Sequence, residues 1–275
     1  GSRTVAKTRI REWIDNTPGC TRIWTFGLTP DWAKKRDVPT QIWPNCPNGA
    51  SPPADNSKAA NFVQWVFTPE GSGGGGFTPA EIPIIELWNE PNFGAAGPSY
   101  GEPHQDEGLF GQVLASGTGA DAARDAGREI PGSIPGNIFF YGTPRELATL
   151  GKAIKDVLPV GVQLVGCGWE DDANVARWMR ASMTVDAGGG FKGADLISMV
   201  TYHPYMYGNA PQNVRNQSVA YRQRLQFLAT EMGRPGLATM PLAASESGYE
   251  DVSGPYTGGA YGYSESQVAA TLKRA

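Results

Sequence analysis

Short apolar runs alternate along this chain with segments whose apolar residues recur at helical spacing, and this rhythm constrains the fold more than any other feature. Such alternation is typical of βαβ units, in which successive strands run parallel and helices cover the sheet. Strands are predicted at residues 21–28, 84–90, 162–167, 196–202 and 242–245. We therefore predict an α/β fold built on a mainly parallel sheet.

Apolar residues with a period near 3.6 predict the helices. In residues 144–158 they include Leu147, Leu150 and Ile154, and Pro144 stands where a first helical turn favours proline. Further helices are predicted at residues 8–14, 221–232 and 264–273. Gly233 is placed to end the helix at 221–232, since glycine readily adopts the left-handed backbone of a helix C-cap.

Composition excludes several classes of protein. Of 275 residues, 40% are hydrophobic, so the chain can bury a sizeable core, and the net charge of −4 without a basic stripe argues against nucleic acid or an anionic membrane as a partner. The sequence contains neither an apolar run of roughly 20 residues, which a membrane span needs, nor a recognisable signal peptide. The three cysteines suit either buried thiols or a Cys20–Cys46 disulfide, and both interpretations stay open.

Two predicted strands end in carboxylates. Glu90 closes the sequence Trp-Asn-Glu before Pro91, and Glu246 follows the small residues of 243–245. Because the carboxyl ends of parallel barrel strands open on one face, the two side chains can meet despite their separation in sequence. A pair of carboxylates suits glycosidic bond cleavage, in which one protonates the leaving oxygen and the other attacks the anomeric carbon. This chemistry needs no metal and no organic cofactor.

Four motifs in order resemble the large clan of (β/α)8 retaining glycoside hydrolases, and family 39 or family 5 within it. They are the segment 26–33, the Asn89-Glu90-Pro91 tripeptide, the segment 197–205 and the strand end at Glu246. The resemblance implies a TIM barrel in which Glu90 is the acid/base on the fourth strand and Glu246 the nucleophile on the seventh. The five recognisable strands then correspond to strands 3 to 7, so residues 1–275 are expected to form a single catalytic barrel domain without its first two strands and its last.

The resemblance also implies the substrate contacts. Asn89 is expected to bind the sugar 2-hydroxyl, while His203 and Tyr205 are expected to face the nucleophile. Trp169 is our choice for stacking on a sugar ring, because it follows a strand end beside an acidic run. The substrate is expected to be a β-linked oligo- or polysaccharide, which favours a secreted or periplasmic location. Two alternatives stay open: a non-catalytic carbohydrate-binding barrel, and a fragment that needs a missing segment or partner chain to complete the barrel.

Overall fold

A computed structural model describes residues 3–37, 47–92, 139–170, 175–204 and 212–245. Within them, five parallel strands form one sheet in the order β1-β2-β3-β6-β7. The strands are β1 (Ile23–Phe26), β2 (Ile84–Leu87), β3 (Gln163–Glu170), β6 (Val200–His203) and β7 (Leu242–Ala244). Each overlaps one of the five predicted strands, and the predicted parallel sheet is confirmed.

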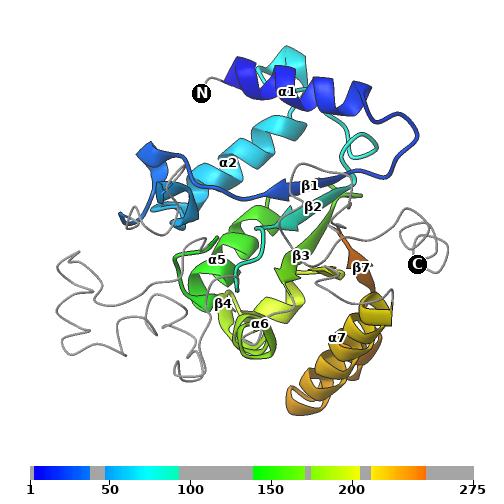
Figure 1. Cartoon of the computed structure of the whole chain (residues 1–275). Helices are drawn as coiled ribbons and strands as arrows, with labels where there is room; N and C mark the ends of the chain where they lie inside the picture. The colour runs from blue at the N-terminus through cyan, green and yellow to red at the C-terminus, as the bar shows by residue number, and fades with distance from the viewer. Residues whose placement is uncertain (1–2, 38–46, 93–138, 171–174, 205–211, 246–275) are drawn as a thin grey trace, which may run out of the picture.

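The helices follow the strands in the same progression. They are α1 (Arg3–Asp15), α2 (Asn56–Phe67), α5 (Pro144–Lys155), α6 (Val175–Thr184) and α7 (Gln212–Glu231). Neighbouring strands of the sheet are also neighbours in sequence, so right-handed crossovers all step in one direction and place their helices on one face. Figure 1 shows the helices succeeding one another along the outside of the sheet. This mixed α/β architecture is compatible with part of an α/β barrel.

Burial of apolar side chains on the helix face of the sheet holds the layers together. Ile85 and Leu87 of β2 pack with Leu147, Leu150 and Ile154 of α5 in one continuous core. A Cβ added at Gly151 would stand 2.7 Å from Leu87 Cδ2, so the absence of a side chain there lets α5 approach the sheet closely. The start of α5 is fixed by a capping box, in which Thr143 and Glu146 each accept from the backbone N–H of the other.

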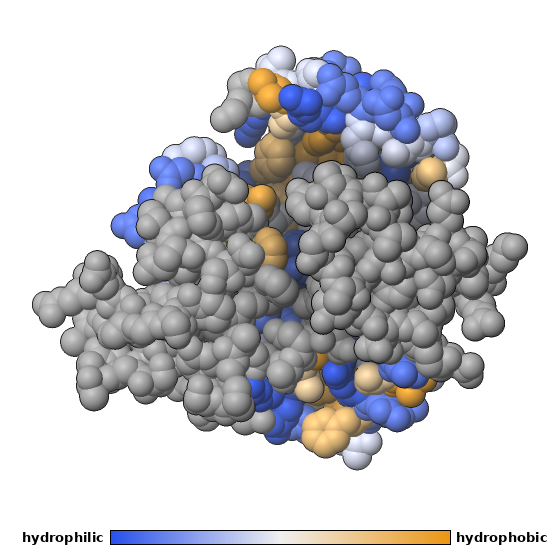
Figure 2. All heavy atoms as spheres, viewed as in Figure 1, coloured by the Kyte–Doolittle hydropathy of each residue, from blue (hydrophilic) through white to orange (hydrophobic). Residues whose placement is uncertain are grey.

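A second apolar cluster lies beneath α1. Ile10 and Ile14 are the buried residues of this helix, and they pack with Trp65 of α2 and with Phe77 and Ile82 before β2. Hydrophilic residues cover the outer side of α1 and hydrophobic ones lie below it (Figure 2). The apolar residues whose spacing predicts this helix are thus among those that pack it against the rest of the fold.

Polar side chains occupy the opposite face of the sheet, which we call the interior face. Thr25, Glu86 and Val165 stand side by side in the β1-β2-β3 register. On β6, Tyr202 packs against Tyr221 of α7, so its neighbours Thr201 and His203 point to the interior face. The fold therefore gathers a threonine, a carboxylate and an imidazole on one surface.

Several elements were not predicted. Helices α2 and α6 are among them, as is an antiparallel pair between α6 and β6, β4 (Asp186–Gly188) and β5 (Phe191–Lys192). Short 3-10 helices lie in the connections at Asp31–Ala33, Pro47–Ala50, Glu70–Ser72, Gly193–Asp195 and Pro235–Thr239. The helix predicted at 264–273 lies outside the described residues. No helix within the described ranges is both long and apolar enough to cross a membrane.

Candidate active site

The candidate site begins where β2 leaves the sheet. The strand ends at Leu87, and the next residues depart from extended backbone, with φ of +66° at Trp88 and +44° at Glu90. Two hydrogen bonds hold this turn between neighbouring strands: Trp88 N–H donates to Phe26 O at 2.8 Å, and Glu90 N–H donates to Gly168 O at 3.1 Å. Glu90 is therefore fixed by its backbone at the carboxyl end of the sheet.

The left-handed backbone also changes the face of the sheet to which Trp88 points. An unbroken strand through residue 90 would place Glu86, Trp88 and Glu90 on one face. Instead, Trp88 is 2% exposed on the helix face, where its ring meets Phe140 edge to face and its Nε1–H donates to Phe139 O at 2.7 Å. The strand ends three residues earlier than predicted, and Glu86 and Glu90 remain with the interior cluster.

The central contact of the site joins β2 to β6. His203 Nδ1 and Glu90 Oε1 lie 2.6 Å apart, between residues 113 positions apart in the sequence. Both side chains are buried, at 1% and 8% exposed respectively. A short bond between a carboxyl group and an imidazole, shielded from water, is an arrangement in which a proton can be held or passed.

Glu86 is a functional candidate that was not predicted from the sequence. It lies on β2 four residues before Glu90, is 1% exposed, and accepts a hydrogen bond from Thr25 Oγ1 on β1 at 2.8 Å. Burial is the main cause of a raised pKa for the Cys167 thiol on β3, and the negative charge of Glu86 raises this pKa further, so the thiol stays protonated. A carboxylate inside an apolar strand was the available signal.

The other predicted site residues fall in different places. Asn89 is half-buried beside Glu90. Trp169 is 1% exposed, and its strand neighbour Tyr202 faces α7, so Trp169 belongs to the core on the helix face. An indole buried there offers no open face for stacking on a sugar, and the structure does not bring it to the site. Tyr205 and Glu246 lie outside the described residues, although β7 runs beside β6 up to Ser245, whose N–H donates to Tyr202 O.

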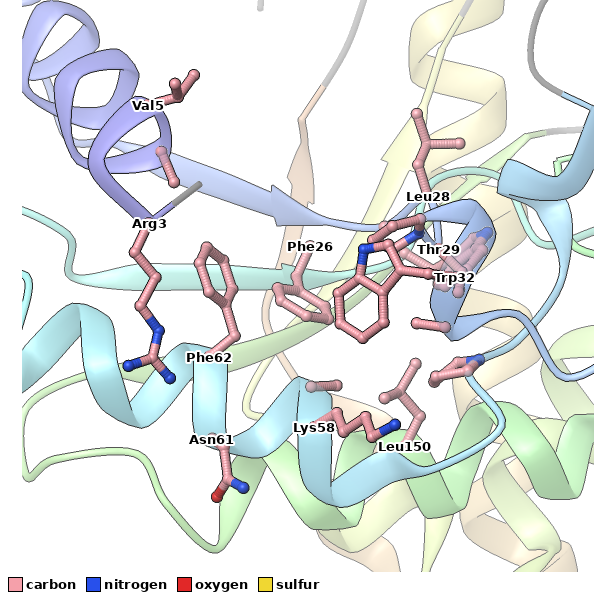
Figure 3. Close-up of a pocket in the computed structure, with 17 residues that line it drawn as sticks. Arg3, Val5, Phe26, Leu28, Thr29, Trp32, Lys58, Asn61, Phe62 and Leu150 are labelled. Atoms are coloured by element: carbon pink, nitrogen blue, oxygen red, sulfur yellow. The ribbon is translucent and has the colours of Figure 1, made fainter. Parts of the chain in front are cut away.

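A pocket of about 570 Å³ lies on the helix face of the sheet edge rather than at the carboxylates. Figure 3 shows Phe26 and Trp32 from the β1 side facing Lys58 and Phe62 on α2. Phe26 follows Thr25 along β1 and so points away from the interior face. Volume alone would favour this pocket as a ligand site, but its lining is mostly apolar and contains no carboxylate. We place the candidate chemistry at Glu90 and His203 instead.

Metal-assisted chemistry has no obvious ligand set in the part of the chain that the structure describes. There, no three His, Cys, Asp or Glu side chains group in a way that could hold a metal ion.

Comparisons with known proteins identify no family. No family model matches the chain, and no curated protein matches it. Among solved structures, the chain is similar to the crystal structure of an agarase, AgWH50C, with 15% sequence identity and a TM-score of 0.42. The match covers 89% of this chain and 32% of the agarase, so the chain spans about a third of that protein's length.

Proposed function

We propose that this chain is a retaining glycoside hydrolase, with Glu90 as the acid/base and Glu246 as the nucleophile, acting on a β-linked oligo- or polysaccharide. The observation that carries the proposal is the buried Glu90–His203 pair at the carboxyl edge of a parallel sheet. Carboxylates at that edge are where barrel enzymes do their chemistry.

The fold supports the proposal through its topology. Five parallel strands in sequential order, with helices on one face and polar residues on the other, fit strands 3 to 7 of a (β/α)8 barrel. In such a barrel the interior face would line the central axis, and Glu90 would stand at its mouth. Strand β7 lies beside β6, which carries His203, and Ser245 N–H donates to Tyr202 O. Glu246 is the next residue in the sequence.

The mechanism has two steps in which Glu90 changes roles. Glu90 gives its proton to the leaving-group oxygen while Glu246 attacks the anomeric carbon and forms a glycosyl ester. Glu90, now a carboxylate, then takes a proton from the water that cleaves the ester. This sequence requires the two carboxyl groups to lie about 5–5.5 Å apart, whereas a separation of roughly 6.5–9.5 Å would mean inversion.

The first experiment exposes the folded chain to a panel of mechanism-based 2-fluoro-glycosides and locates any adduct by peptide mass spectrometry. The expected result is a sugar ester on the peptide containing Glu246, lost in Glu246→Gln and kept in Glu250→Gln, a matched control four residues further along. Turnover at the wild-type rate in Glu246→Gln would refute the assignment. Tight sugar binding without product or adduct would instead support a non-catalytic carbohydrate-binding barrel.

The acid/base role has its own signature. Glu90→Ala should lose most activity toward substrates with poor leaving groups and much less toward aryl glycosides that leave without protonation. Azide should restore turnover by replacing the base-activated water. If both substrate classes lose activity equally and azide has no effect, Glu90 is not the acid/base.

A further inference from the structure

The carboxylate of Glu86 is buried with half of its hydrogen-bonding capacity unused. Glu86 Oε2 accepts from Thr25 Oγ1, but Glu86 Oε1 has no hydrogen-bond partner among the residues that the structure describes, although Glu86 is only 1% exposed. A buried acceptor without a donor is costly, and buried charges are normally paired. A residue kept in this position despite that cost calls for a role beyond packing.

The imidazole of His203 stands beside this orphan oxygen. At Gly168 on β3, the point where a Cβ would stand is 2.6 Å from His203 Nε2 and 3.4 Å from Glu86 Oε1. Gly168 has no side chain to separate the two groups, and its N–H is held by Thr201 Oγ1 at 2.9 Å. His203, which contacts Glu90 through Nδ1, therefore has its Nε2 bordering the same small space beside Gly168 as Glu86 Oε1, without a hydrogen bond between the two atoms.

We propose that Glu86 is a positioning residue that keeps a proton on His203 Nε2, so that Nδ1 is left as the partner that exchanges a proton with Glu90. A negative charge beside Nε2 favours the protonated state of that nitrogen, and the proton on one ring nitrogen decides what the other can do. The catalytic part of this inference rests on the proposed function. The assignment of the His203 tautomer does not depend on that function.

The proton count closes without any outside reactant. When Glu90 is protonated, its O–H donates to Nδ1 of a neutral ring that carries its hydrogen on Nε2. If that proton crosses the 2.6 Å bond, Glu90 becomes a carboxylate and the ring becomes an imidazolium, while Glu86 neither gains nor loses a proton. Nε2 carries a hydrogen in both states, and a single proton is shared between Glu90 Oε1 and His203 Nδ1.

The titratable groups around the ring come from three strands. Glu86 lies on β2 and Glu90 follows the end of that strand, Cys167 lies on β3 next to Gly168, and His203 itself ends β6. Cys167 stays a thiol, for the reasons given above, and Thr25 and Thr201 do not titrate. Glu86 and Glu90 are thus carboxyl groups that the described contacts bring close to the imidazole.

The experiment is side-chain NMR on the full chain labelled with ¹⁵N-histidine. The chain has two histidines, so His104→Gln assigns both sets of signals. Long-range ¹H–¹⁵N spectra distinguish a hydrogen on Nε2 from one on Nδ1, and wild-type His203 is expected to show the Nε2–H pattern. In Glu86→Gln the neutral ring should change to the Nδ1–H form, which donates to ionised Glu90. Wild-type protein with the Nδ1–H form would overturn the inference without any variant.

A matched control separates this effect from loss of stability. Glu146→Gln also removes a carboxylate, half-buried on α5 at the helix face, and should leave the His203 spectrum unchanged. A His203 pattern in Glu86→Gln identical to that of wild type and Glu146→Gln would show that Glu86 does not position the ring.

Kinetics then extend the test to catalysis. Glu86→Gln should lower kcat about 10- to 100-fold, taking as a guide the range known for outer partners that orient metal-binding imidazoles, with little change in KM. A tautomer change in a chain that cleaves no glycoside would uphold the positioning role and refute the proposed activity. Unchanged kinetics in an active chain would refute the positioning role alone.

Discussion

Gly168 should be far less tolerant of alanine than another glycine with the same backbone conformation. Gly168 has φ of +58° and Gly233 has φ of +63°, so alanine at either site adopts a left-handed conformation. That strain costs about 1–2 kcal/mol, partly offset because alanine also restricts the unfolded chain. We therefore expect Gly233→Ala, which meets no atom within 4 Å, to lower the free energy of unfolding by about 1 kcal/mol.

The difference between the two sites is the space around the new methyl group. At Gly168 it would stand 2.6 Å from His203 Nε2 and 2.9 Å from Cε1, closer than carbon atoms can approach. The ring cannot move aside cheaply, because it is 1% exposed and tied to Glu90 by a 2.6 Å bond. Overpacking of this kind adds roughly 1–3 kcal/mol, so Gly168→Ala should cost about 3 kcal/mol in total.

Urea unfolding followed by tryptophan fluorescence measures this difference. With a slope of about 3 kcal/mol per molar urea, the further 2 kcal/mol lost in Gly168→Ala would move its midpoint roughly 0.7 M below that of Gly233→Ala. The slopes should agree, since neither change alters the surface exposed on unfolding. Equal midpoints for the two variants would refute the close packing of Gly168 against His203, and with it the geometry on which the role of Glu86 depends.

Three further outcomes follow from the described contacts. Burial favours a raised pKa for Glu146, but hydrogen bonds and charge from Arg36 outweigh burial and hold the pKa below its usual value. Glu146→Gln should therefore lower the free energy of unfolding by about 2 kcal/mol at pH 7, as measured by chemical denaturation. The stabilisation from a lowered carboxyl pKa is complete above the unfolded value of about 4.3 and is lost as pH falls through the folded one, so wild type and variant should converge in acid. Exposed Cys20 should react with a thiol reagent in the native protein, whereas buried Cys167 should react only after unfolding, as peptide mass spectrometry can show. Leu147→Ala, at a site 1% exposed, should lower stability by about 3 kcal/mol in the same urea assay, and a loss below 1 kcal/mol would contradict the packing of α5.

The sheet could be predicted from sequence because its signal is local. Each strand is a short apolar run ended by glycine, proline or polar residues, and Pro144 together with the periodic leucines predicts α5. Helix α2 was not predicted, because residues 43–57 are rich in turn-forming residues and this composition indicates a loop that extends past Asp55. That residue is the N-cap, whose side chain accepts from Ser57 N–H, and the buried positions Val63 and Val66 follow from it at helical spacing.

The ends of strands were harder to predict, because tertiary contacts decide them. Nothing in the sequence Leu-Trp-Asn-Glu shows that Trp88 will take a left-handed backbone. It does so because its N–H finds Phe26 O on β1 and its indole finds Phe139 O and the ring of Phe140. Those partners lie 51 or more residues away, and local propensity cannot anticipate them.

By contrast, strand alternation alone could have predicted that Glu86 and His203 lie together on the interior face. Strands of a parallel sheet covered on both faces are apolar throughout, so Glu86 inside Ile-Ile-Glu-Leu and His203 after Val-Thr-Tyr are exceptions that need a common cause. The strand register supplies this cause. Glu86 is paired with Thr25 across β1 and β2, so both point to the same face of the sheet. Tyr202 points to α7 on the other face, so the next residue, His203, points to the face of Glu86. Polar residues that break the apolar pattern on the same face of successive strands must share one buried environment, and buried charge is tolerated only where partners or function compensate for it. The unpartnered oxygen of Glu86 is the point in this cluster where packing and hydrogen bonding give no compensation, which is why we assign it a role in setting the proton on His203 rather than in holding the fold.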